Sequence, residues 1–168
     1  AGLTLGHTEA PGECVGGVVD MTAVDSAIIS QCKLFGCGVI GVRSQDSTGI
    51  QVVESEIYDC SYSAAQIYTS LNVVFNNCKI YDNETFSSLF YFSTSENCAV
   101  INCEISGNSI SNSDAQGGGG VTIGGQSFTM YGGSISHNSA DYGGGVGWNS
   151  YGKFYMYGGE ITDNTATT

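Results

Sequence analysis

The fold is decided by a block that reads FTMYGGSISHN at residues 128–138 and FYMYGGEITDN at residues 154–164. Four weaker copies come earlier in the chain, and all six copies align on one apolar anchor position. The anchor residues are Leu34, Ile57, Ile80, Ile105, Ile135 and Ile161. Successive anchors are 23 to 30 residues apart. A repeat of this length predicts a stack of similar structural units.

Two further columns of the alignment are almost wholly apolar and indicate which side chains face the interior. Seven residues before the anchor stand Ala27, Ile50, Val73, Cys98, Phe128 and Phe154. Five residues before it stand Ile29, Val52, Phe75, Val100, Met130 and Met156. Side chains alternate along a strand, so these two columns face the same way, as do the anchor and the position two residues before it. The odd step between the two pairs predicts a corner between two short strands.

The pattern predicts an all-β fold, a right-handed parallel β-helix (solenoid) of about six to seven coils. We expect a single β-helix domain over residues 1–168, with an irregular first coil or cap at 1–26 and regular coils at 27–168. A weak extra coil would place Leu3 and Leu5 in the columns seven and five residues before an anchor. Leucine-rich repeats would need more leucines, and a β-sandwich would show Asn-Gly or Asp-Gly turns, which this sequence lacks.

The column three residues after the anchor is predicted to form a ladder at a turn. Its members are Cys37, Cys60, Asn83, Asn108, Asn138 and Asn164. Coils of a solenoid stack ~4.8 Å apart, so like residues lie on like. Asparagine tolerates left-handed turn geometry, and its amide can bond the next amide in the stack. We interpret this column as structural.

Two outward columns flank the anchor. The column before it begins Lys33, Glu56, Lys79, Glu104, so opposite charges lie side by side and support the alignment. The column after it begins Phe35, Tyr58, Tyr81. Three stacked aromatic side chains can stiffen the sheet, form a platform for sugar rings or contact another chain, and the sequence leaves these readings open.

The seven cysteines also leave two readings open. They can be small buried apolar side chains. Alternatively, Cys37 with Cys60 and Cys78 with Cys103 are predicted neighbours on adjacent coils, at a spacing that permits disulfides. A zinc site is not expected, because the chain has no paired Cys-x-x-Cys motif and its two histidines, His7 and His137, lie far from the cysteine cluster.

Charge excludes several classes of partner. The chain carries 16 acidic and 4 basic residues, for a net charge of −12. Nucleic acids and anionic membranes attract clustered Lys and Arg, so neither is an expected partner. No apolar run approaches the ~20 residues that span a bilayer. The abundance of Ser, Thr and Asn is typical of secreted β-rich proteins, and we expect an extracellular or cell-surface location.

The best candidates for chemistry are Asp59 and Asp82, which the alignment places on adjacent coils ~5 Å apart. This pair is a solvated acidic edge, a Ca²⁺ site or a glycosidase pair. No further part of a catalytic motif accompanies it, and Arg43 has no evident carboxylate partner. The sequence therefore predicts no catalytic residue and no cofactor, with Ca²⁺ at Asp59 and Asp82 as the only metal candidate.

The repeats resemble known β-helix proteins. The coil length and asparagine ladder look like the pectin-lyase-like superfamily. Gly132-Gly133-Ser134-Ile135 with Asn138, and Gly158-Gly159-Glu160-Ile161 with Asn164, resemble the Gly-Gly-x-Ile…Asn repeats of bacterial surface β-helix proteins such as the polymorphic outer-membrane adhesins. The resemblance implies a surface location.

We therefore expect a non-catalytic extracellular structural or adhesive module. It would be a segment of a surface adhesin or a filament subunit that associates end to end with copies of itself. The alternative is a carbohydrate-binding or polysaccharide-degrading domain, a lyase or glycoside hydrolase, that takes a surface glycan or host ligand at Phe35, Tyr58 and Tyr81.

Overall fold

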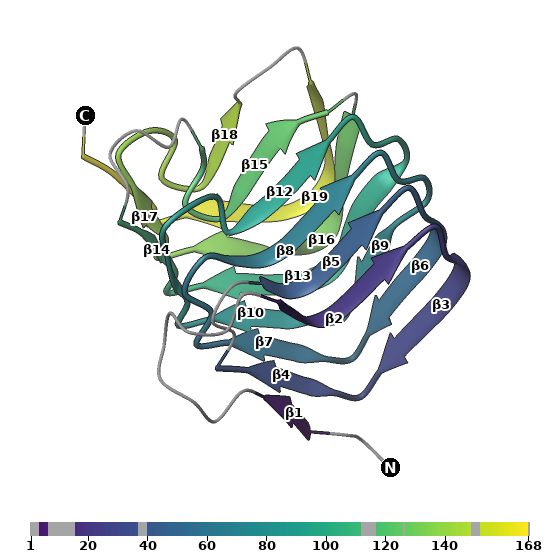
Figure 1. Cartoon of the computed structure of the whole chain (residues 1–168). Coiled ribbons are helices and arrows are strands. Elements are labelled where there is room, and N and C mark those ends of the chain that lie inside the picture. The colour runs from purple at the N-terminus through teal and green to yellow at the C-terminus, as the bar shows by residue number, and fades with distance from the viewer. Residues whose placement is uncertain are drawn as a thin grey trace.

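The computed structural model describes residues 4–6, 16–36, 40–111, 117–125, 127–148 and 152–167. These residues form a parallel β-solenoid of about six turns, and they contain no helix. Figure 1 shows the coils following one another along the solenoid axis, with strands of successive coils side by side. The predicted fold class is confirmed.

The strands of successive coils form three parallel sheets, of which the smallest begins only at residue 84. The ten-stranded sheet contains β1 (Thr4–Gly6), β3 (Asp25–Ser30), β4 (Lys33–Phe35), β6 (Thr48–Val53), β7 (Glu56–Tyr58), β9 (Val74–Asn76), β10 (Lys79–Tyr81), β13 (Cys98–Ser106), β16 (Ser127–Ser136) and β19 (Lys153–Thr162). The six-stranded sheet contains β2 (Gly17–Thr22), β5 (Ile40–Gln45), β8 (Ser63–Tyr68), β12 (Phe90–Ser93), β15 (Val121–Gly124) and β18 (Val146–Trp148). The four-stranded sheet contains β11 (Glu84–Thr85), β14 (Ser109–Ile110), β17 (Ser139–Ala140) and β20 (Thr165–Ala166).

The register of the ten-stranded sheet is the one that the repeat predicts. The six anchors pair in succession from Leu34 to Ile161. The predicted corner separates β3 from β4, β6 from β7 and β9 from β10, at residues of positive φ: Gln31, Glu54 and Asn77. In the later coils, β13, β16 and β19 continue through the same corner, where Asn102, Gly133 and Gly159 have positive φ.

The N-terminal coils differ from the sequence-based expectation. Leu5 pairs with the anchor Leu34, not with the column five residues before it. The register assigned to Leu5 from the pattern was therefore wrong. Strand β2 already pairs in register with β5, so regular pairing begins before residue 27.

The interior is a continuous apolar column. Anchors Leu34 to Ile135 are completely buried. Next to them, Phe75 packs edge-on against Phe90 with ring centroids 4.7 Å apart, and Phe92 packs against Phe128 at 4.8 Å. Buried side chains from two sheets thus hold the coils in one register and fix where the outward side chains lie.

The asparagine ladder lines one corner of the solenoid. The Nδ2 of Asn83 donates to Oδ1 of Asn108 at 2.8 Å, Asn108 donates to Asn138 at 2.8 Å, and Asn138 donates to Asn164 at 3.0 Å. The backbone N–H of Cys60 donates to Oδ1 of Asn83, which extends the column, whereas Cys37 lies outside the described residues.

The left-handed turn conformation expected of these asparagines belongs instead to the residues before them. Asp82, Gly107, His137 and Asp163 have φ values of 50° to 66°. This arrangement lets each asparagine side chain point inward. There its amide donates a hydrogen bond to the carbonyl of an anchor residue, which is shielded from water.

Candidate functional site

The outer face of the ten-stranded sheet carries the ionic column that the repeat predicts. Lys33 Nζ lies 3.0 Å from Glu56 Oε2, and Lys79 Nζ lies 3.5 Å from Glu104 Oε2. The hydrogen bond from Lys33 holds the pKa of Glu56 below its usual value. These exposed pairs are worth roughly 0–1 kcal/mol each, so their main effect is to fix the side chains in place.

The structure brings Phe35, Tyr58 and Tyr81 together as a stack. The ring centroids are 5.3 Å apart for Phe35 and Tyr58, with an 8° angle between the planes, and 5.2 Å apart for Tyr58 and Tyr81, with a 15° angle. Parallel rings this close overlap face to face. Both faces of Tyr58 are therefore engaged by its neighbours, and the stack does not offer three free ring faces to a ligand.

The aromatic stack ends where coil composition changes. Tyr81 is in register with Ser106, and Asp82 is followed in the next coil by Gly107. A depression of about 370 Å³ lies at this step. We call it the Tyr81 notch, and its lining residues are Glu56, Lys79, Tyr81, Asp82, Glu104 and Ser106.

Hydrogen bonds fix the walls of the Tyr81 notch. The Tyr81 hydroxyl donates to Glu56 Oε2 at 3.0 Å, and the Ser106 hydroxyl donates to Glu104 Oε1 at 3.4 Å. Burial, with the Glu56 carboxylate next in weight, raises the pKa of Tyr81 to about 12. At neutral pH the Tyr81 hydroxyl is therefore a fixed donor and the Glu56 carboxylate a fixed acceptor.

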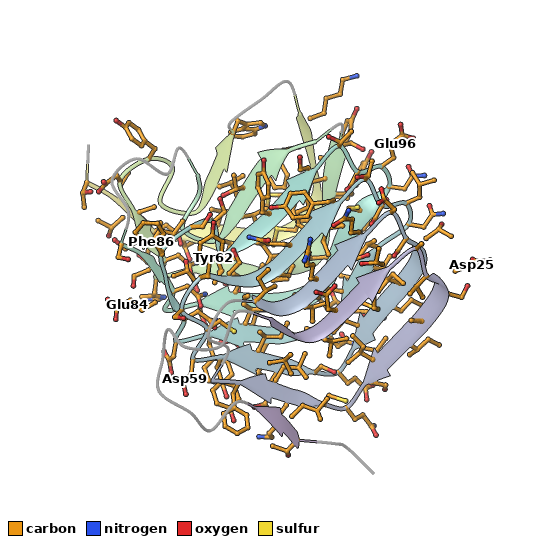
Figure 2. The ribbon with its side chains drawn as sticks, in the orientation of Figure 1. Asp25, Asp59, Tyr62, Glu84, Phe86 and Glu96 are labelled. Carbon is orange, nitrogen blue, oxygen red and sulfur yellow. The ribbon has the colours of Figure 1, made fainter. Side chains whose placement is uncertain are left out.

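The candidate acidic pair lies on adjacent coils as predicted. The backbone N–H of Asp59 bonds the carbonyl of Asp82 at 3.3 Å. In Figure 2, Asp59 and Glu84 lie along one edge of the molecule with Tyr62 and Phe86, whose exposed rings are 6.3 Å apart. Among the residues that the structure describes, no three His, Cys, Asp or Glu side chains gather as a metal would require. Within the described part of the chain, Asp59 and Asp82 therefore remain a two-carboxylate Ca²⁺ candidate without a third His, Cys, Asp or Glu ligand.

Arg43 does have a carboxylate partner, and the expectation that it lacked one was wrong. Its Nη1 lies 3.4 Å from Asp20 Oδ2, and its Nη2 donates to Gln45 Oε1 at 2.8 Å. A depression of about 330 Å³ adjoins it, lined by Arg43, Gln45, Gln66, Tyr68 and Thr69. Arg43, Gln45, Gln66 and Tyr68 belong to the six-stranded sheet, and Thr69 directly follows its strand β8. The strands of this sheet fall between the aligned blocks, so the alignment gave no register for them.

Cys78 and Cys103 are neighbours on adjacent coils, as predicted, and both are thiols in the structure. Each Sγ lies 3.3 Å from an interior carbonyl, that of Val52 for Cys78 and that of Phe75 for Cys103. Hydrogen bonding to Cys78 and burial raise the pKa of the Cys103 thiol, which keeps it protonated. The second predicted pair includes Cys37, which lies outside the described residues.

The C-terminal end of the described solenoid exposes its interior columns. Trp148, Met156 and Ile161 are the last described members of three apolar columns and are 49%, 41% and 38% exposed. An apolar depression of about 450 Å³ adjoins Trp148 and includes Tyr142. This surface combines apolar side chains with the outer edges of β18, β19 and β20, and such edges can pair with another strand.

Comparisons with known proteins give a fold and no family. No protein-family model matches the chain, and no curated protein matches it. Among solved structures, the crystal structure of the periplasmic alginate epimerase AlgG matches with a TM-score of 0.62 and 17% identity, over 87% of this chain and 39% of that chain. The chain thus spans less than half of that protein, and the likeness shows the β-helix fold alone. No helix in the described part of the chain is long and apolar enough to cross a membrane.

Proposed function

We propose that this chain is a non-catalytic structural and adhesive β-solenoid module of an extracellular or cell-envelope surface. The observation that carries the proposal is that charged and hydroxyl groups on the outer face of the ten-stranded sheet bind one another. Lys33 pairs with Glu56, Lys79 pairs with Glu104, and Tyr81 donates to Glu56. These contacts connect one coil to the next and stabilise the stack.

The pKa shifts support a non-catalytic role for this face. A general acid or base works best when its pKa lies near the operating pH. The lysine contacts move the pKa of Glu56 downward, and burial with the Glu56 contact moves that of Tyr81 to about 12. Both shifts lead away from neutral pH, whereas active sites tune such groups toward it.

The proposed location rests on charge and on the fold neighbour. The net charge of −12 disfavours nucleic acids and anionic membrane surfaces as partners. The neighbour with the same fold is a periplasmic protein, which supports a secreted or envelope location. The exposed apolar end near Trp148, Met156 and Ile161 supports contact with a further coil, including one from a second copy.

The test incubates the immobilised chain with a panel of neutral and acidic polysaccharides. Mass spectrometry of the soluble fraction measures product, and the fraction retained on the beads measures adhesion. We expect retention of at least one polysaccharide with no cleaved, unsaturated or epimerised product. Product that disappears in the Asp59→Asn, Asp82→Asn double variant would replace the proposal with an enzymatic function.

A further inference from the structure

We propose that the Tyr81 notch is a binding site for one neutral sugar ring of a surface glycan. The inference supplies the ligand class of the adhesive module and rests on that proposed function. It starts from one departure in the repeat. Two coils carry Tyr58-Asp59 and Tyr81-Asp82 at the same place, and the next coil carries Ser106-Gly107.

The two small residues together create the notch. Ser106 occupies the position where a fourth aromatic ring would continue the stack beyond Tyr81. Gly107 has a φ of +66°, and a Cβ there would lie 3.1 Å from Asp82 Oδ1. A larger pair of side chains would therefore fill the space beside both Tyr81 and Asp82.

The end of the stack leaves one face of Tyr81 available. One side of the ring stacks on Tyr58 at 5.2 Å, and the other side faces the coil of Ser106. The C–H face of a pyranose is apolar and flat, and it packs against an aromatic face in the same way as other apolar rings. Tyr81 thus differs from Tyr58, whose two faces are both covered.

The polar lining suits sugar hydroxyls. Asp82 and Glu104 provide acceptor oxygens at the sides of the notch, and Lys79 provides donors. Glu104 is held by both Lys79 and Ser106, at 3.5 and 3.4 Å. Because these groups are already positioned, little side-chain entropy is lost when a ligand binds. A volume of about 370 Å³ lies at the small end of ligand sites and accommodates a single ring.

The charge of the notch disfavours an acidic sugar as the ligand. The notch holds three carboxylates, Glu56, Asp82 and Glu104, and one ammonium group, Lys79. An acidic sugar would place its carboxylate or sulfate among these like charges, which costs free energy. Hydroxyl groups, in contrast, donate to carboxylates without any opposing charge.

The test titrates the whole chain with methyl glycosides of glucose, galactose, mannose and N-acetylglucosamine, observed by NMR. Glucuronic acid and glucosamine serve as the anionic and cationic counterparts. Ser106→Tyr extends the aromatic stack over Tyr81 and should weaken binding at least 10-fold. Thr162→Tyr is the matched control, because it adds the same ring to the same column three strands beyond Tyr81 and should change affinity less than 2-fold.

A second variant, Tyr81→Leu, removes the ring and keeps an apolar contact with Tyr58, and it should also lose binding. Thermal unfolding of each variant shows that it is folded. The proposal is overturned if no neutral glycoside binds, if binding survives Ser106→Tyr in a folded protein, or if glucosamine or glucuronic acid binds more tightly. These outcomes differ from a failure of the proposed function, whose signs are product formation from a polysaccharide or the absence of any polysaccharide retained on the immobilised chain.

Discussion

At the scale of single residues, the glycines at the corner of the long strands are constrained by the coil beneath them. Gly133 has a φ of +85°, and a Cβ there would lie 2.1 Å from the carbonyl oxygen of Cys103. Gly158, in contrast, does not adopt the left-handed conformation. A Cβ added there would lie 3.6 Å from its nearest neighbour, the backbone nitrogen of Gly132. The repeated Gly-Gly motif therefore contains one position that requires glycine, that of Gly133, and Gly158 occupies the other position without such a requirement.

We predict that Gly133→Ala destabilises the protein by at least about 2 kcal/mol, because it combines backbone strain with a clash against a neighbouring coil. Gly158→Ala should change the free energy of unfolding by less than about 1 kcal/mol. Urea unfolding followed by circular dichroism measures both. Equal losses in the two variants would show that the close approach to Cys103 does not determine the requirement for glycine.

Tyr81 gives a prediction for alkaline pH. Its pKa is raised to about 12 in the folded protein from an ordinary value of 10, first by burial and then by the Glu56 carboxylate. Because the folded-state pKa is raised, the protonated Tyr81 hydroxyl contributes fully to stability below pH 10. This contribution is lost as the pH rises through 12. Ultraviolet titration should therefore show one tyrosine that ionises near pH 12, and Tyr81→Phe should remove it. Ionisation of all ten tyrosines near pH 10 would contradict this assignment.

At the scale of elements, the strands β4, β7, β10 and β13 are joined by alternating charges. Lys79 lies in register between Glu56 and Glu104. We predict that Lys79→Glu lowers stability by about 1 kcal/mol, because three like charges then lie side by side. Adding Glu104→Lys should recover most of that loss, and high salt should reduce it. A Lys79→Glu loss that is independent of salt would point to packing instead of charge.

The sequence predicts some elements better than others, for physical reasons. The anchors reveal the register of β4 to β19 because a buried position tolerates few side chains, so the pattern persists through every coil. Asp20 and Arg43 lie in the six-stranded sheet, between blocks of variable length, and their pairing could be found only in three dimensions.

The aromatic column shows the same limit at the candidate site. Its residues could be identified from the repeat, but a sequence alignment does not give the angle between neighbouring ring planes. The covered faces of Tyr58 therefore emerged only from the stacking geometry. The Tyr81 notch did have a sequence signal, the change from Tyr81-Asp82 to Ser106-Gly107, which the repeat alignment contains.

At the scale of the whole molecule, apolar surface is concentrated at the β18 and β19 end. Met156 and Ile161 occupy interior columns yet are 41% and 38% exposed. Stacking of a further coil would bury them and pair the outer edge of β19. This arrangement is heterologous, so it can repeat along the axis.

We predict that the 168-residue chain associates reversibly as its concentration rises and that Met156→Asp with Ile161→Asp suppresses the association. Ile28→Asp is the control, because Ile28 is 69% exposed and lies on the outward face of β3, away from this end. Sedimentation velocity measures the distribution of species. A strict monomer at every concentration, or equal suppression by Ile28→Asp, would exclude association through this end.

The Ser106-Gly107 step has a consequence for how new recesses can evolve in such a molecule. Each coil offers the same two positions beside the asparagine corner, and the backbone there follows the same path whether they hold Tyr-Asp or Ser-Gly. Substitution of these two residues can therefore open or close a recess without a change in the backbone of the coil. Because coils stack ~4.8 Å apart, the recess can be relocated along the rod in steps of that length, and two recesses can be spaced to match the repeat of a polymer.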